Sequence, residues 1–275
     1  MIIVSLTTIP NRIKYLQPVV DSILDQTVKP DVIKLYIPKE YKKRSLGMID
    51  MDELPKGCEV VYLDEDDGPA TKILPALKEY RGKDVSIVYC DDDKIYNKNW
   101  IKRLTDKSKE NPHDCIIEEG SHLGWNMFKF WEGNNRFKYR FLRIVSLGFW
   151  HPKNKLPKKN SKYYDIAEGH GGVLVKPSFF PSEVFDIPDI MWSVDDIWLS
   201  GMMTVHGTKI QRTVKTKAEK SVPINIKKDQ PLNLYSYKGY DRGAADCLCA
   251  KYFIDNYGIW EQYKDLCYKV FIPHY

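Results

Sequence analysis

The sequence predicts an α/β protein whose first hundred residues form a parallel, doubly wound unit. Apolar, β-branched runs that suit buried strands alternate with segments whose apolar residues recur at helical spacing. The order is strand, helix, strand, strand, helix, strand, which is typical of a parallel sheet covered by helices. Three of these strands end in unusual polar sequences, and ligands of such sheets bind at the carboxyl ends of the strands.

In the first half, strands are expected over residues 2–6, 32–37, 58–63 and 85–90. The first helix carries an apolar stripe from Leu16 to Leu24, which requires Pro18 to lie in its first turn. A second helix carries a stripe from Ile73 to Tyr80, and residues 39–57 are expected to be a loop.

The second half is less regular. We expect a helix around residues 100–104, a short strand over 115–117, and glycines before a strand over 173–175. A helix opens within residues 192–202, with Ser193 as its N-cap. Residues 216–275 are expected to form a helical extension packed on the core, with apolar stripes over 245–253 and 263–266.

Residues 121–164 combine aromatic side chains with a lysine-rich run. Two interpretations stand. The segment is a mobile lid or an acceptor-facing or membrane-facing surface, or it is a solvated lysine loop beside a few core aromatics.

The composition indicates one large domain, or one domain with an appendage. The chain has 275 residues, 43% of them hydrophobic and 29% charged, and a formal net charge of +5. The mild positive excess suits an anionic substrate without indicating nucleic acid. We expect a cytoplasmic protein, because no run approaches the ~20 apolar residues of a membrane span and no leader precedes the first strand. The six cysteines are expected to be free thiols in a reducing compartment.

Three consecutive carboxylates, Asp91, Asp92 and Asp93, directly follow the strand over 85–90. Like charges there repel one another, so the arrangement costs stability unless a cation or hydrogen-bond donors offset it. Mg²⁺ and Mn²⁺ suit such a site, since they bind carboxylate and diphosphate oxygens. In an extended chain Asp91 and Asp93 share one face and Asp92 points away.

Five blocks of the sequence together resemble the GT-A fold glycosyltransferases that use nucleotide-sugar donors, in particular inverting family 2. These blocks are VSLTTIPNRI, DDGPATKILPAL, YCDDD, GHGGVLV and VDDIWLSGM. The resemblance covers roughly residues 1–215. It implies a Rossmann-related mixed sheet with a nucleotide-binding half over residues 1–100 and an acceptor and catalytic half over 101–215.

The resemblance also implies roles for individual residues. Asp93 would bind Mn²⁺ or Mg²⁺, and Asp91 would bind the ribose or the metal. Asp196 would be the general base that activates a hydroxyl acceptor, with Asp195 as its substitute. The donor, a UDP-sugar, would contact a set of residues from both halves: Thr7, Thr8, Arg12, Asp66, Lys72, Asp91, Asp92, Gly171 and Gly172. Gly68 would lead the segment that carries Lys72, and His170 and His206 are possible additional metal ligands.

Other readings of the same residues remain open at this stage. A nucleotidyltransferase uses a similar scaffold, but usually carries a glycine-rich loop where this chain has TTIPNR. A metal-dependent nuclease or phosphatase would also use clustered carboxylates. The non-enzymatic alternative is an inactive relative that binds carbohydrate.

Overall fold

The computed structural model describes residues 1–41, 46–134, 161–214, 222–223, 236 and 239–271. Its main element is a mixed sheet with the strand order β3-β2-β1-β4-β10-β6-β11-β8. The parallel strands are β1 (Ile2–Thr7), β2 (Val32–Pro38), β3 (Glu59–Leu63) and β4 (Ser86–Tyr89). Antiparallel β10 (Val173–Val175) then joins β4 to β6 (Cys115–Ile117). The predicted mixed α/β fold is therefore confirmed.

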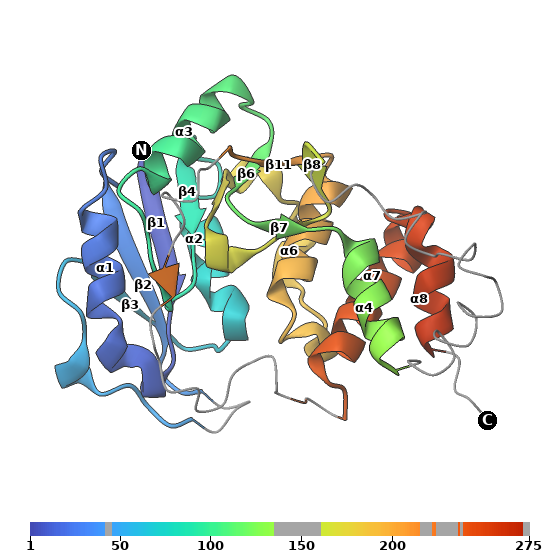
Figure 1. Ribbon diagram of the computed structural model, residues 1–275. Helices are drawn as coiled ribbons and strands as arrows, with labels where there is room; N and C mark the ends of the chain where they lie inside the picture. The colour runs from blue at the N-terminus through green and yellow to red at the C-terminus, as the bar shows by residue number, and fades with distance from the viewer. Residues whose placement is uncertain (42–45, 135–160, 215–221, 224–235, 237–238, 272–275) are drawn as a thin grey trace.

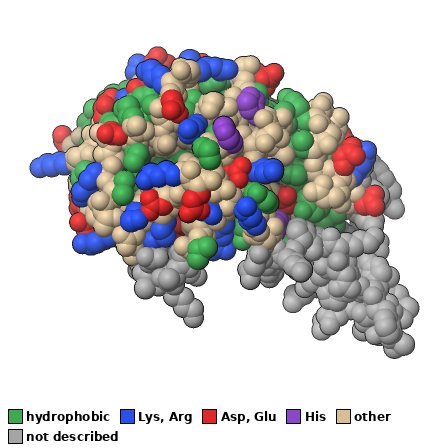
Figure 2. Space-filling view, turned by 90° about the horizontal axis from the view of Figure 1, so that it is seen from above, with side chains coloured by type: hydrophobic (Ala, Val, Ile, Leu, Met, Phe, Trp, Pro, Cys, Tyr) green, Lys and Arg blue, Asp and Glu red, His purple; other side chains and the backbone are tan. Residues whose placement is uncertain are grey.

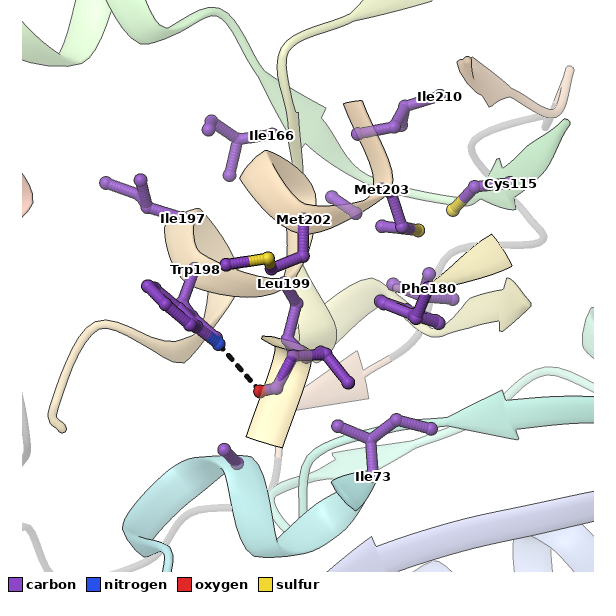
Figure 3. Close-up of a cluster of buried hydrophobic side chains, with 14 of the residues drawn as sticks. Ile73, Cys115, Ile166, Phe180, Ile197, Trp198, Leu199, Met202, Met203 and Ile210 are labelled. Atoms are coloured by element: carbon purple, nitrogen blue, oxygen red, sulfur yellow. Dashed lines mark hydrogen bonds between the residues drawn. The ribbon is translucent and has the colours of Figure 1, made fainter. Parts of the chain in front are cut away.

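Both faces of the sheet are covered, and successive side chains of β1 point alternately into the two cores. Val4 and Leu6 pack against helices α1 (Gln17–Leu24) and α3 (Trp100–Glu110). Ile3 faces the opposite core, which is formed by α2 (Leu74–Glu79) and α6 (Asp195–Val205). In Figure 3 the side chains of α6 that fill this core include Trp198, whose indole N–H donates to the Val184 carbonyl over 2.9 Å.

The remaining elements complete the sheet edges and the connections. The short strands are β5 (Lys94–Ile95), β7 (Gly120–Ser121), β8 (Tyr163–Tyr164), β9 (Ile166–Ala167), β11 (Ile210–Arg212) and β12 (Val222–Pro223). The 3₁₀ turns are η1 (Pro10–Tyr15), η3 (Met51–Glu53), η4 (Gly68–Lys72), η6 (Gly169–Gly171), η7 (Pro177–Phe179), η8 (Ser182–Phe185), η9 (Asp189–Met191) and η12 (Glu261–Tyr263).

Three further helices lie together at the end of the molecule opposite α1 (Figure 1): α4 (Leu123–Asn134), α7 (Arg242–Tyr257) and α8 (Lys264–Phe271). Helix α7 packs on α6, where the Trp198 and Phe253 rings lie 5.4 Å apart. No helix among the described residues is long and apolar enough to cross a membrane. Seen from the end at which β1 begins, the surface intersperses Lys and Arg with Asp and Glu (Figure 2).

The structure confirms some local predictions and contradicts one. Pro18 lies in the first turn of α1 as expected, and all six cysteines are free thiols. The prediction of Ser193 as an N-cap was wrong: α6 begins at Asp195 after Val194, and no side chain caps it. The sequence did not predict α4, and much of the aromatic and lysine-rich segment, over residues 135–160, lies outside the described residues.

The contact between α6 and α7 gives a stability prediction. A Cβ on Gly201 would lie 2.3 Å from the ring of Phe253, which is fully buried, so the ring or the helix would have to shift. Overpacking of a core typically costs ~1–3 kcal/mol, more than the ~1 kcal/mol that Ala gains over Gly inside a helix. We therefore expect Gly201→Ala to lower the free energy of unfolding, measured by urea denaturation. In a Phe253→Leu background the same change should cost less, and an equal cost in both backgrounds would contradict this packing.

Candidate active site

The candidate site is centred on the ammonium group of Lys72, which is 4% exposed. Its Nζ lies 2.7 Å from Asp91 Oδ1, 2.9 Å from Asp195 Oδ2 and 3.7 Å from Asp196 Oδ1. Burial lowers the pKa of Lys72, but the charges of Asp195, Asp91 and Asp196 outweigh that effect and raise it well above its ordinary value. Carboxylates from distant parts of the chain thus converge on one cation.

Sheet register brings these segments together. Ser5 pairs with Tyr89 across β1 and β4, so the two strands end side by side. The hydroxyl of Ser5 also donates to the Lys72 carbonyl over 2.5 Å, which fixes η4 against β1. Val173 of antiparallel β10 pairs with Tyr89, so the turn η6 that precedes β10 lies beside Asp91.

Turn η6 approaches the lysine so closely that a side chain at Gly169 would displace the Lys72 ammonium from its position. A Cβ on Gly169 would lie 2.4 Å from Lys72 Nζ and 3.1 Å from Asp91 Oδ1. The backbone N–H of Gly169 instead donates to Asp196 Oδ1 over 3.2 Å. The two neighbouring glycines also have packing roles: Gly172, at φ +90°, lies against the indole of Trp100, which donates to the Gly171 carbonyl over 2.9 Å.

The tryptophan before α6 positions the second acidic pair. The indole of Trp192 covers Gly68, where a Cβ would lie 2.4 Å from the ring, and its N–H donates to the Asp66 carbonyl over 3.2 Å. The Asp66 side chain accepts from the Gly68 N–H over 2.8 Å. This contact fixes the start of α6 near η4, and hence brings Asp195 to Lys72.

Asp196 has the most distinctive electrostatics in the site. Burial and the adjacent charge of Asp195 raise its pKa from 3.8 to about 7, although Lys72 opposes the shift. A carboxylate that titrates near neutrality can accept a proton from a hydroxyl group. Burial also tends to raise the pKa of Asp91, but the charge of Lys72 outweighs the effect of burial, so the pKa of Asp91 is lowered.

The acidic stretch after β4 differs from the extended geometry that we expected. The chain bends at Asp92 and Asp93, so these two residues, rather than Asp91 and Asp93, share a partner. Asp92 accepts from the Thr8 hydroxyl over 2.6 Å and from Arg12 Nη1 over 2.7 Å. Asp93 Oδ2 lies 3.8 Å from the same Nη1, while its buried Oδ1 has no hydrogen-bond partner.

The other predicted site residues are distributed as follows. The Thr7 hydroxyl donates to the Tyr36 carbonyl over 2.8 Å, within the sheet. His170 lies in η6 beside the site, and its Nε2 is 3.8 Å from Glu168 Oε2. His206 was an incorrect candidate ligand, because it follows the last turn of α6, ~15 Å from the turn that holds Asp195. The described part of the chain contains no cluster of three or more His, Cys, Asp or Glu arranged to hold a metal.

Sequence reasoning assigned no role to Gly169 or Trp192, nor to Arg242 in the first turn of α7, on which the charges of Asp195 and Asp196 act. Burial lowers the pKa of its guanidinium, but the charges of Asp246, Asp195 and Asp196 outweigh that effect and raise it. A basic residue opening a helix is unfavourable beside the positive end of the helix dipole, and this was the available signal.

The comparisons with known proteins agree with this geometry. The sequence model of "Glycosyl transferase family 2" matches residues 6–173. No curated protein matches the sequence. The structure resembles S. aureus TarS 1-349 in complex with UDP-GlcNAc, with a TM-score of 0.53 and 13% identity over 96% of this chain and 69% of that one.

Two further structures are similar. A crystal structure of S. aureus TarS gives a TM-score of 0.50 and 13% identity, over 98% of this chain and 42% of that one. Mannosyltransferase PcManGT from Pyrobaculum calidifontis, in complex with GDP-Man and Mn²⁺, gives a TM-score of only 0.43 at 13% identity, over 79% of this chain and 58% of that one. This chain therefore spans between 42% and 69% of the length of these proteins. At such identities the likeness establishes the fold alone.

The raised pKa of Asp196 gives a prediction for stability. The folded protein keeps the Asp196 proton up to about pH 7, whereas the unfolded chain loses it near 3.8. This group therefore lowers stability as the pH rises between those values. We expect Asp196→Asn to stabilise the protein relative to the unmodified chain at about pH 8, on the order of 2 kcal/mol, and much less at about pH 4. Urea denaturation at both pH values measures the difference.

The matched control is Asp84→Asn. The Asp84 side chain is 89% exposed and pairs with Lys176 at the surface. A pH-dependent gain of the same size in both variants would contradict the assignment to Asp196.

Proposed function

Because the chain belongs to glycosyl transferase family 2, we propose that it transfers a sugar from a nucleotide-sugar donor, a UDP-sugar, to a hydroxyl group of a glycan or another acceptor. The proposal rests on the convergence of Asp91, Asp195 and Asp196 on Lys72 at the carboxyl end of the parallel strands. Nucleotides bind at this end of doubly wound sheets.

The surplus of negative charge in the site favours the binding of a divalent cation, Mn²⁺ or Mg²⁺. Lys72 and Arg12 face five carboxylates, which are Asp91, Asp92, Asp93, Asp195 and Asp196. An anionic diphosphate would be repelled from that surplus of negative charge unless a cation accompanied it. Asp93 suits the cation because its Oδ1 is buried without a hydrogen-bond partner. Mg²⁺ commonly uses only one or two carboxylates together with substrate phosphates, so a full protein cluster is not required.

We assign the following chemistry to the side chains. Asp196 accepts the proton of the acceptor hydroxyl. The hydroxyl oxygen forms a bond to the anomeric carbon of the donor sugar while the bond from that carbon to the diphosphate breaks. The Gly169 N–H orients the accepting carboxylate, and Lys72 holds Asp195 and Asp91 in place. A cation bound by Asp93 and Asp91 would stabilise charge on the departing diphosphate. Attack from the face opposite the leaving group inverts the configuration.

In this proposal residues 1–100 hold the nucleotide and residues 101–215 hold the acceptor and the base. Asp92, Thr8 and Arg12 form a buried group that fixes the acidic bend, and Thr7, Asp66, Gly171 and Gly172 shape the walls around it. Contact of Lys72 with donor phosphates stays a prediction, since its ammonium already has three carboxylate neighbours.

The metal assignment predicts a selective loss of donor binding in Asp93→Ala. Calorimetric titration with UDP and Mn²⁺ should show at least about tenfold weaker binding than the unmodified chain, because the cation loses a carboxylate ligand. UDP binding without Mn²⁺ should be equally weak in both proteins. Asp64→Ala is the control, as Asp64 is exposed and pairs with Lys39. Metal-dependent binding that survives Asp93→Ala would contradict the assignment.

The base assignment predicts a separation of binding from transfer. Asp196→Asn should keep UDP binding within about threefold and lower turnover by at least about a hundredfold, since Asn cannot accept the proton. Turnover is measured as release of nucleoside diphosphate from a panel of nucleotide sugars with Mn²⁺. In the unmodified enzyme kcat/KM should fall below about pH 7 as Asp196 becomes protonated. An Asp196→Asn enzyme that retains turnover would refute the assignment.

A further inference from the structure

Two hydrogen bonds join α6 to the segment that leads from β9 into the turn η6. Strand β9 packs against α6, and Figure 3 shows its Ile166 beside that helix. The Ala167 N–H at the end of β9 donates to Ser200 Oγ over 2.9 Å. Two residues further, the Gly169 N–H donates to Asp196 Oδ1 over 3.2 Å. Two side chains of α6 therefore accept from two alternate amides of one segment.

The repeats of the two elements explain this pairing. Glu168 lies between the two amides in an extended conformation, at φ −96° and ψ 114°. Its own N–H points the other way and donates to the Glu119 carbonyl over 3.2 Å, because successive amides of an extended chain face opposite sides. Ser200 and Asp196 are four residues apart, so they lie on one face of α6, one turn from each other. The helix thus presents two acceptors to two donors that face the same way.

The Ser200 hydroxyl is held in one orientation. It is fully buried, and its O–H donates to the Asp196 carbonyl, one turn back along α6, over 2.6 Å. Because its only proton is used there, the oxygen meets the Ala167 N–H as an acceptor. Ala167 is also fully buried, so its N–H would lose a hydrogen bond if the hydroxyl were removed. The hydroxyl therefore fixes the position of β9 relative to α6.

We propose that Ser200 is a positioning residue for Asp196, because its hydroxyl holds β9 against α6 and so keeps the Gly169 N–H on the Asp196 carboxylate. This inference rests on the proposed function, since it takes Asp196 as the base. Ser200 is fully buried and acts through the backbone of residues 167–169, not by contact with substrate. Without its hydroxyl the segment can shift, and Asp196 loses the donor that orients it.

The kinetic test compares two hydroxyl groups of one helix. Ser200→Ala removes the contact with β9. Thr204→Ala is the matched control, because the Thr204 hydroxyl donates to the Ser200 carbonyl over 2.8 Å, which is the same type of bond one turn further along. We expect Ser200→Ala to lower kcat for release of nucleoside diphosphate at least about tenfold, since the base is misoriented. The KM for the donor and the affinity for UDP with Mn²⁺ should stay within about threefold, and Thr204→Ala should keep all three values within about threefold.

Two further readouts separate positioning from packing. Loss of a hydrogen-bond donor disfavours the charged carboxylate, so the fall of kcat/KM at acid pH should begin at a higher pH in Ser200→Ala than in the unmodified chain. Ser200→Thr keeps a hydroxyl on Cβ and should restore both kcat and the pH profile. Thermal melts verify that each variant is folded. If Ser200→Ala does not fold, Ser200→Cys replaces it, because sulfur is a weak acceptor.

A measurement on the protein alone makes the test independent of activity. The amide proton of Gly169 is followed by NMR from about pH 5 to about pH 9, the range that brackets the titration of Asp196. In the unmodified chain its chemical shift should follow that titration, because this N–H donates to the carboxylate. The dependence should fall by at least about half in Ser200→Ala and remain in Thr204→Ala.

Three results would overturn the proposal. The first is a Ser200→Ala enzyme that keeps either its kcat or its Gly169 titration. The second is an equal loss in Thr204→Ala, which would assign the effect to the stability of α6. The third is a loss of UDP affinity as large as the loss of kcat, which would indicate a general disturbance of the site. If the unmodified chain releases no nucleoside diphosphate, the proposed function fails, and the NMR comparison of the two alanine variants still decides the role of Ser200.

Discussion

The ion cluster around Lys72 is the interaction on which the rest of the site depends. A buried ammonium group is stable only if its lost hydration is replaced, and here Asp91, Asp195 and Asp196 replace it. Removing either of the two nearer carboxylates, Asp91 or Asp195, typically costs ~3–5 kcal/mol, because the buried ammonium is left uncompensated. Asp196 lies farther away, at 3.7 Å, and its raised pKa shows that its own charge is unfavourable in the folded protein. The end of β4, the η4 turn and the start of α6 are therefore held together by one cation, although each belongs to a different part of the fold.

Close packing around this ion cluster, rather than backbone flexibility, explains why glycines stand at these positions. Gly169 has no side chain because the lysine and Asp91 occupy the space that a Cβ would need. Gly68 and Gly172 have positive φ angles, and each lies beneath a tryptophan, Trp192 and Trp100 respectively. A glycine that the sequence predicts to contact a ligand is thus also required by the packing around the site. Substrate contact and packing do not exclude one another at these positions.

The sequence predicted the sheet and the acidic blocks because periodicity and strand-end chemistry are local signals. It could not predict which carboxylate pairs with which basic side chain, since that pairing depends on a bend at Asp92 and on the register between β4 and β10. Ser193 failed as a cap for a related reason: a buried segment before α6, anchored by Trp192, determines where that helix begins. His206 has suitable chemistry, but the length of α6 separates it from the acids.

Arg242 shows how a local violation of helix chemistry reports a distant partner. An arginine in the first turn is repelled by the helix dipole, and burying most of its side chain adds a desolvation cost. Asp246 offsets part of that cost near neutral pH, and because burial raises its pKa to about 6 it loses its charge as the pH falls below that value. The charges of Asp195 and Asp196 supply the remaining attraction.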